Sequence, residues 1–269
     1  METLKWLFRV IKDLIIQSRD FKLSKEAFDN KETTDTKKVI SFNIERDKAS
    51  KNDWPVRREQ IVSFIKKESP DIICMQEVMP HQHRYLRNNT IGDYSMFFTD
   101  TITKNSIGLI ISEGLLIAFK DKYAVEECDY INLSNCFGFK TKHWRICQVL
   151  KLKNKKEIVY VFNTHLDHVD REARKEGFRK ILDRINHIKN SGDFDASNTK
   201  FFICGDFNTE ITWDEVANSF AKQFNCMYFS DGTVVDKTIC IDYIFTNIEG
   251  NYNCIREEMS DHYPVIFTV

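Results

Sequence analysis

The chain has 269 residues, and its 39 Lys and Arg nearly balance 40 Asp and Glu, which leaves a formal net charge of -1 at pH 7. This balance excludes the strongly basic character of proteins that live on nucleic acid, although a local basic patch remains compatible with it. No run of about 18 uncharged apolar residues occurs, so no segment is expected to span a membrane.

The amino-acid content indicates one large, globular and ordered domain. Hydrophobic residues make up 42% of the chain, and 21 Phe stand against only 9 Gly and 4 Pro, which favours regular elements joined by short loops. The eight Cys include no C-x-x-C pair and follow no secretory signal, and Cys74, Cys147, Cys204 and Cys240 lie inside apolar runs. We therefore expect reduced, buried thiols and a cytoplasmic protein.

The first 21 residues have the spacing of an amphipathic helix, with apolar positions at Leu4, Leu7, Phe8, Ile11, Leu14 and Ile15. A helix that covers the body of the protein is the favoured interpretation, and contact with a membrane surface or a partner through residues 1–20 is the alternative. Residues 24–38 are polar and read as a tether. We expect residues 1–37 to form this helix and tether, and residues 38–269 to form the catalytic domain.

From Val39 onward, short apolar runs alternate with helical patterns, which predicts an α/β fold built from layers of sheet and helix. Strands are expected at 39–43, 71–77, 115–119, 145–152, 158–165, 201–206, 241–246 and 264–269. Helices are expected at 55–68, 80–89, 172–190 and 212–222, the last with capping-box spacing between Thr212 and Glu215.

Metal-competent and proton-competent side chains fall at the ends of these strands. Five follow or close a strand, and three open one: Asn43, Glu77, His165, Asp206 and Asn208, then Asp242, Asp261 and His262. In a mixed or antiparallel sheet the start of one strand lies beside the end of its neighbour, so all eight can meet at one edge. That arrangement is typical of an active site.

The run "FFICGDFN" at 201–208 shows the pattern most clearly. Its unbroken apolar start predicts a central strand covered on both faces. Gly205 is expected to permit a sharp exit from the strand, with Phe207 anchored in the core while Asp206 and Asn208 point together the other way. Taken alone this run is equally consistent with an ordinary turn, just as "SDH" alone fits a cap.

The chemistry of the set is coherent. Carboxylate and amide oxygens suit a hard cation such as Mg²⁺, with Mn²⁺ as a substitute, whereas zinc is disfavoured. Two His beside such a cation can stabilise charge on phosphoryl oxygens or protonate a leaving group, and a carboxylate behind each ring would hold its orientation. The set therefore favours phosphoryl hydrolysis.

The ordered motifs resemble those of the endonuclease/exonuclease/phosphatase superfamily, the deoxyribonuclease-like proteins, and look most like its compact bacterial-type branch. They are "FNI" (42–44), "DWPVRRE" (53–59), "PDIICMQEV" (70–78), "NTHLDH" (163–168), "GDFN" (205–208), "IDYIF" (241–245) and "SDHYPV" (260–265). The resemblance runs from Val39 to Val269. It implies a two-layered mixed β-sandwich flanked by helices, the four-layer α/β/β/α fold.

The resemblance also implies roles for single residues. Asn43, Glu77 and Asp261 would be metal ligands. Asp206 would orient or deprotonate the attacking water, and Asn208 would steady the water and the phosphate. His262 backed by Asp242, and His165 backed by Glu113, would stabilise phosphoryl charge, while Arg174 would help to bind phosphate. The sequence departs from the family at Glu45, where Arg is frequent, although Arg46 follows directly.

The sequence thus predicts a Mg²⁺-dependent phosphoester hydrolase whose partner is a phosphorylated small molecule or a nucleic acid. A small phosphomonoester, such as a sugar or inositol phosphate, fits the neutral charge and short loops. A nuclease is the first alternative, because residues 171–184 carry six basic side chains, although Glu172, Glu176 and Asp183 interleave with them. A non-catalytic interaction module is the second alternative, but it would not need the full set of site residues.

Overall fold

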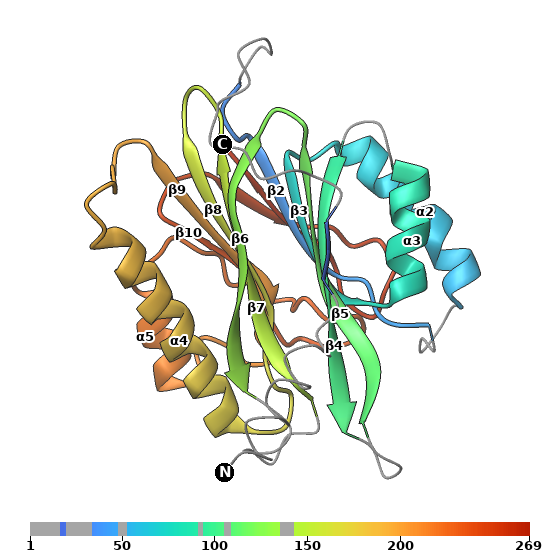
Figure 1. The fold of residues 1–269 in the computed structure, drawn as a ribbon. Helices are drawn as coiled ribbons and strands as arrows, with labels where there is room; N and C mark the ends of the chain where they lie inside the picture. The colour runs from blue at the N-terminus through green and yellow to red at the C-terminus, as the bar shows by residue number, and fades with distance from the viewer. Residues whose placement is uncertain (1–16, 20–33, 48–52, 91–93, 105–108, 135–142) are drawn as a thin grey trace, which may run out of the picture.

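The structure is a computed structural model that describes residues 17–19, 34–47, 53–90, 94–104, 109–134 and 143–269. Two β-sheets pack face to face, and helices cover their outer faces (Figure 1), which confirms the four-layer fold. The five-stranded sheet has the order β10 (Asp242–Thr246), β9 (Thr199–Asp206), β8 (Ile158–His165), β7 (Arg145–Lys153) and β6 (Ala124–Ser134).

The second sheet has seven strands and mixes parallel and antiparallel pairs. Its order is β1 (Gln17–Arg19), β4 (Tyr94–Lys104), β5 (Leu109–Lys120), β3 (Ile72–Val78), β2 (Lys38–Asn43), β12 (Val265–Thr268) and β11 (Asn251–Cys254). The eight predicted strands are all present. β1 lies inside the segment predicted as a helix, so that prediction is wrong at 17–19, where the backbone pairs with β4 instead. The rest of residues 1–33 lies outside the described part.

Four helices occur among the described residues. α2 (Trp54–Glu68) and α3 (Pro80–Thr90) pack on the seven-stranded sheet, while α4 (Arg171–Lys189) and α5 (Glu215–Ala221) cover the five-stranded sheet (Figure 1). The predicted start of α5 at Thr212 is wrong. The Asp214 carboxylate accepts hydrogen bonds from the N–H groups of Val216 and Ala217, so Asp214 is the N-cap and the helix begins at Glu215.

Alternate side chains of β9 pack into two different hydrophobic cores. Phe201 and Ile203 pack with α4 and α5, whereas Phe202 and Cys204 face the other sheet. This double burial explains the unbroken apolar run, as the sequence predicted.

Three buried amides cross the interface between the sheets. Gln76 Nε2 donates to Asn163 Oδ1 at 2.8 Å, and Asn163 Nδ2 donates to Gln148 Oε1 at 3.2 Å. Gln148 in turn donates to the carbonyls of Phe97 and Leu115. Because buried amides must be paired, these hydrogen bonds favour one alignment of the two sheets. The bonded amides lie directly beneath Glu77 and His165.

Strands β4, β6 and β11 were not expected from the sequence. β6 presents Glu126, Glu127 and Asp129 on its less buried positions, and β11 is a short, largely exposed edge strand, so neither has a clear apolar run. The end of the predicted tether is also packed, because Thr36 donates through both its N–H and its hydroxyl to Glu157.

The seven described cysteines are free thiols, as expected. Among the described helices, none combines the length and apolarity needed to cross a membrane.

Candidate active site

Three neighbouring strands place one polar side chain each at the same end of the five-stranded sheet. His165 closes β8 and lies beside Asp206 of the parallel strand β9, while Asp206 pairs with Asp242 at the start of the antiparallel strand β10. The expectation that strand starts and strand ends meet at one edge is therefore confirmed for these three residues.

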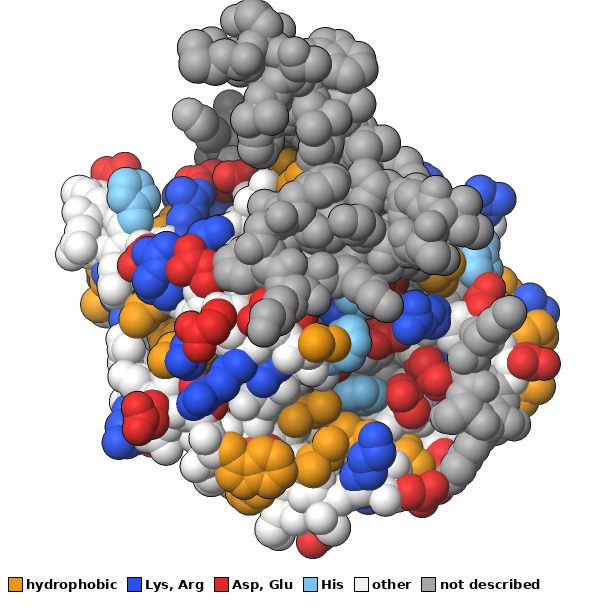
Figure 2. All heavy atoms as spheres, turned by 90° about the horizontal axis from the view of Figure 1, so that it is seen from below, with side chains coloured by type: hydrophobic (Ala, Val, Ile, Leu, Met, Phe, Trp, Pro, Cys, Tyr) orange, Lys and Arg blue, Asp and Glu red, His pale blue; other side chains and the backbone are white. Residues whose placement is uncertain are grey.

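The seven-stranded sheet places further polar side chains at the same end of the molecule. Asn43 closes β2 opposite Gln76 of β3, and Glu77 follows directly. The Ser260 hydroxyl donates to the Asn43 carbonyl at 2.7 Å, which brings the following residues Asp261 and His262 to the same end. Seen from this end, His, acidic and hydrophobic side chains lie close together on the surface (Figure 2).

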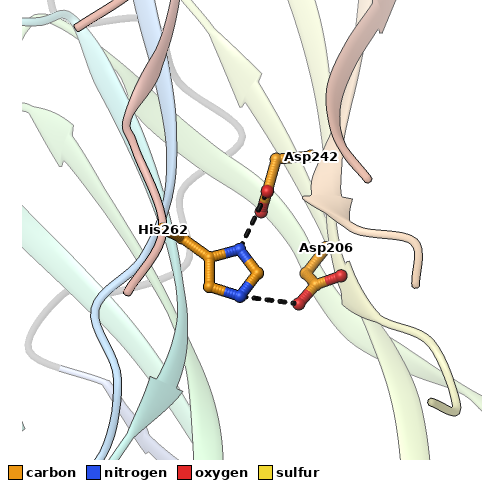
Figure 3. Close-up of side chains that lie close together, drawn as sticks. All are labelled: Asp206, Asp242 and His262. Carbon is orange, nitrogen blue, oxygen red and sulfur yellow. Dashed lines mark hydrogen bonds and ion pairs between the residues drawn. The ribbon is translucent and has the colours of Figure 1, made fainter. Parts of the chain in front are cut away.

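His262 is held by Asp242. Its Nδ1 lies 2.8 Å from Asp242 Oδ2 (Figure 3). The Thr233 hydroxyl donates to the same oxygen at 2.6 Å. Burial alone would lower the pKa of His262, but the charge and hydrogen bond of Asp242, together with Asp206, raise it to about 10. The imidazole is therefore protonated at neutral pH.

Asp206 lies between the two histidines. Its Oδ2 is 3.5 Å from His165 Nε2 and 3.8 Å from His262 Nε2, and it accepts a hydrogen bond from Asn43 Nδ2 at 3.1 Å. Burial and the nearby charge of Asp242 raise the pKa of Asp206 to about 7. A carboxylate with this pKa can take a proton from a bound water near neutral pH.

Glu77 is the second carboxylate of the site with a raised pKa, and its side chain is 19% exposed. Burial and the charge of Glu113 bring this pKa to about 7, although Asn43 Nδ2 donates to Glu77 at 3.3 Å and Arg46 lies 3.9 Å away. Glu77 also has a positive φ of 58°, which turns the chain at the end of the regular strand pairing. A cation beside Glu77 would offset the free-energy cost of holding its negative charge away from water.

Donor atoms of Asp206, Asp242 and His262 lie within 4.8 Å of one another, which by distance alone fits a metal centre. Asp242 Oδ2, however, is already bonded to His262 Nδ1 and to the Thr233 hydroxyl, so this oxygen is occupied within the protein. The oxygen donors at Glu77 and Asn43 fit a hard divalent cation better. The Asn43 amide meanwhile bridges Glu77 and Asp206 through its nitrogen, and its oxygen accepts from the Glu45 N–H at 3.0 Å.

Glu113 does not back His165, so that expectation is wrong. Arg145 Nη1 lies 3.1 Å from Glu113 Oε1, His143 Nδ1 lies 3.5 Å from the same oxygen, and Arg46 lies 3.7 Å from the other. His165 Nδ1 has no hydrogen-bond partner among the described residues. A guanidinium attracts the carboxylate more strongly than a neutral imidazole does. Burial, together with the charge of Arg145, lowers the pKa of His165 well below its ordinary value.

The loop after β9 is built differently from the sequence expectation. Gly205 lies within the strand, where an added Cβ would come 2.3 Å from the Thr164 carbonyl oxygen, so close packing of β8 requires glycine there. The turn is made by Asn208, whose φ is 50° and whose side chain donates to the Leu166 carbonyl at 3.0 Å. Phe207 is fully buried, as expected.

Arg174 lies in the first turns of α4, where its Nη1 donates to the Asp167 carbonyl at 2.9 Å. No described contact joins it to the His and Asp side chains of the site, so its phosphate-binding role stays a prediction. The other basic residues of α4 are largely paired: Arg179 with Glu176 and Asp183, and Arg171 with Asp214.

Arg145 is the main residue of this region that the sequence analysis missed. It opens β7, which runs antiparallel to β8 with Cys147 opposite Thr164, so its guanidinium lies near the end of β8. The rule that located Asp242 at a strand start applies equally to Arg145. Ser260 and Thr233, which hold the loops of His262 and Asp242, have no comparable signal in the sequence.

Residues 40–262 match the model of the Endonuclease/Exonuclease/phosphatase family. An uncharacterised protein of Acanthamoeba polyphaga mimivirus is 24% identical over 253 residues, covering 79% of this chain and 91% of that protein. Among solved structures, an endonuclease/exonuclease/phosphatase from Bacteroides vulgatus has a TM-score of 0.69 at 23% identity and covers 87% of this chain and 98% of its own. A mannosyl-6-phosphatase of Bacteroides thetaiotaomicron has a TM-score of 0.66 at 18% identity, covering 86% and 98%.

Proposed function

The chain belongs to the endonuclease/exonuclease/phosphatase family, whose members are phosphoesterases, and from this premise we propose that it hydrolyses a small phosphomonoester such as a sugar or inositol phosphate. The observation that carries the proposal is Asp206, a buried carboxylate with a pKa near 7 between His165 and His262. Such a group suits the activation of water at a phosphate.

The two histidines have different tasks in this proposal. His262, kept protonated by Asp242, donates to a phosphoryl oxygen and offsets the charge that develops there. His165 is neutral and uses its Nε2 to orient the phosphate or the water beside Asp206. Asn208, in the turn after β9, steadies the same groups.

Glu77 and Asn43 would hold a divalent cation, with Asp261 contributing from the adjacent loop, and Mg²⁺ fits their oxygen donors. When bound, this cation neutralises negative charge on the phosphate oxygens. Arg46, which lies 3.9 Å from Glu77, provides a further positive charge for the phosphate.

Two observations support a small monoester over a nucleic acid. Most basic side chains of α4, unlike Arg174, are paired with neighbouring acids, which weakens the clearest candidate for a backbone-tracking surface. One of the similar structures is a mannosyl-6-phosphatase. The free thiols of the described cysteines are also compatible with our proposal that the protein works in the cytoplasm.

The test measures release of inorganic phosphate from sugar phosphates and inositol phosphates, and release of p-nitrophenol from bis(p-nitrophenyl) phosphate, by the purified chain with Mg²⁺, with Mn²⁺ and with EDTA. We expect turnover of monoesters with either metal and none with EDTA. Glu77→Gln should remove the activation by metal, whereas Glu249→Gln, at an exposed turn, should keep it. Cleavage of the diester alone would instead establish a nuclease-type activity, and inertness towards all substrates would contradict the proposal.

A further inference from the structure

The Arg46 side chain lies between two acidic side chains of the site. Its Nε lies 3.9 Å from Glu77 Oε2, and its Nη1 lies 3.7 Å from Glu113 Oε2. Glu113 has a second positive partner, because Arg145 Nη1 lies 3.1 Å from its other carboxylate oxygen. For Glu77, the described residues provide an ion pair with Arg46 alone. Arg46 is therefore the side chain that balances the charge of Glu77 most directly.

The backbone before Arg46 is firmly held. Glu45 has a positive φ of 54°, a conformation that is unfavourable for a residue other than glycine. Its N–H donates to Asn43 Oδ1 at 3.0 Å, and its carbonyl accepts from Gln82 Nε2 at 3.0 Å. Arg57 Nη2 donates to the carbonyls of both Glu45 and Arg46, at 3.1 Å and 2.9 Å. The main chain thus directs Arg46 toward the site, whereas its side chain remains 50% exposed.

The two contacts of the Arg46 guanidinium are weak. Both distances exceed those of ordinary N–H···O hydrogen bonds, which run from roughly 2.7 to 3.2 Å. Arg46 and Glu77 therefore attract each other as charges without a hydrogen bond that fixes their geometry. An ion pair with a half-exposed member contributes little, because water screens the charges and the long side chain loses freedom. The guanidinium can leave Glu77 at little cost in free energy.

A divalent cation at Glu77 would compete with this contact. At equal distance, its attraction to the carboxylate is about twice that of a guanidinium, because Coulomb energy scales with charge. The two positive groups would also repel each other beside one carboxylate. A substrate phosphate offers the displaced guanidinium a better partner, since arginine and phosphate form two parallel charge-assisted hydrogen bonds.

We propose that Arg46 and the divalent cation compete for Glu77, and that the guanidinium displaced by the cation binds the phosphate of the substrate. This inference rests on the proposed phosphomonoesterase function and adds an order of events to it: the cation binds first and makes Arg46 available to the phosphate. Arg46 therefore weakens cation binding and strengthens phosphate binding. A merely structural residue would not have these two opposite effects.

The first test measures Mn²⁺ binding without substrate, by electron paramagnetic resonance of the unbound ion. Arg46→Gln should bind Mn²⁺ at least about fivefold more tightly than the wild-type protein, because the competing positive charge is removed. Arg46→Lys keeps the charge and should stay within about twofold of wild type. Arg58→Gln is the matched control, because it removes a positive charge that lies over the Tyr85 ring on α3, and its Mn²⁺ affinity should be unchanged.

The second test measures binding of inorganic phosphate by calorimetry in saturating Mn²⁺. Arg46→Gln should bind phosphate at least about tenfold more weakly than wild type, since the charge-assisted bonds of the guanidinium are lost. Arg46→Lys should also bind phosphate more weakly, because an ammonium group cannot form two parallel bonds. Thermal unfolding checks that each variant is folded.

Mn²⁺ affinity that is unchanged or weaker in folded Arg46→Gln would overturn the competition. Unchanged phosphate affinity in this variant would overturn the second half of the inference. Both measurements are independent of turnover, so they separate this inference from the proposed function. Failure of the wild-type protein to bind Mn²⁺, or to release phosphate from any monoester, would instead contradict the metal-dependent phosphomonoesterase function itself.

Discussion

His262 and Asp242 are 20 positions apart in the chain, yet Nδ1 of the imidazole lies 2.8 Å from Oδ2 of the carboxylate. Asp242 opens β10, while His262 comes from the loop that leads into β12 of the other sheet. The pair therefore joins the two sheets at the site (Figure 3) and keeps the imidazole charged.

Asp242→Asn should lower the pKa of His262 from about 10 and reduce turnover by about 100-fold or more, the scale of losing an oriented catalytic group. Because the folded pKa is raised, the pair stabilises the fold fully below the ordinary His pKa of about 6.5, and this stabilisation fades as pH rises through about 10. The stability gap between wild type and variant should therefore be largest at acidic and neutral pH and shrink above pH 9. NMR titration of His262 and urea unfolding across pH measure both effects, and an unchanged His262 pKa would refute the pairing.

Asp206→Asn should leave the fold intact and lower kcat by at least about 100-fold, because an amide cannot accept the proton of the attacking water. The carboxylate is buried at the end of β9, and the amide has nearly the same shape, so circular dichroism and the unfolding midpoint should stay close to wild type. Asp195→Asn, at an exposed turn, is the matched control. Near-normal kcat in a folded Asp206→Asn protein would mean that another group activates the water.

Arg57→Lys should destabilise the protein by about 3 kcal/mol, since several bonds from one buried guanidinium are lost together. Arg57 is 2% exposed and donates to the backbone carbonyls of Glu45 at 3.1 Å and Arg46 at 2.9 Å, besides that of Ile44. These bonds hold the loop that follows Asn43. The neighbouring Arg58 lies over the Tyr85 ring, and Arg58→Lys should change stability by less than about 1 kcal/mol. Chemical unfolding of both variants checks the difference, and equal effects would exclude a special role for Arg57.

Asp71→Asn should destabilise the fold at neutral pH, with an effect that disappears in acid. Burial would raise the pKa of Asp71, but the Lys122 side chain and the N–H groups of Lys37 and Lys38 together hold this pKa below its ordinary value. A lowered folded pKa means that the stabilisation is present above about pH 4 and is lost as pH falls through the folded pKa. Thermal unfolding from pH 2.5 to 7, with the exposed Asp193→Asn as control, measures it. A gap that persisted at pH 2.5 would argue against the charge as its source.

Hydrophobic pattern and chain order, by themselves, determined the layers of the fold and most of the site. All eight expected strands form. Apolar runs such as Phe201 to Cys204 fit a strand in the middle of a sheet that is covered on both faces, because both sets of alternate side chains are then buried. The polar residues at strand ends then meet, because neighbouring strands of a sheet bring their ends together, as His165, Asp206 and Asp242 do.

What only the tertiary structure decided is how these polar groups are partnered. Glu113 pairs with Arg145 and not with His165, because a guanidinium from the adjacent sheet comes within 3.1 Å of it, and no local pattern records that distance. The raised pKa values of Glu77 and Asp206 likewise arise from burial and from neighbours brought by other strands. Side-chain pairing and charge state depend on contacts between segments far apart in the chain, so periodicity locates a site while packing assigns its partners.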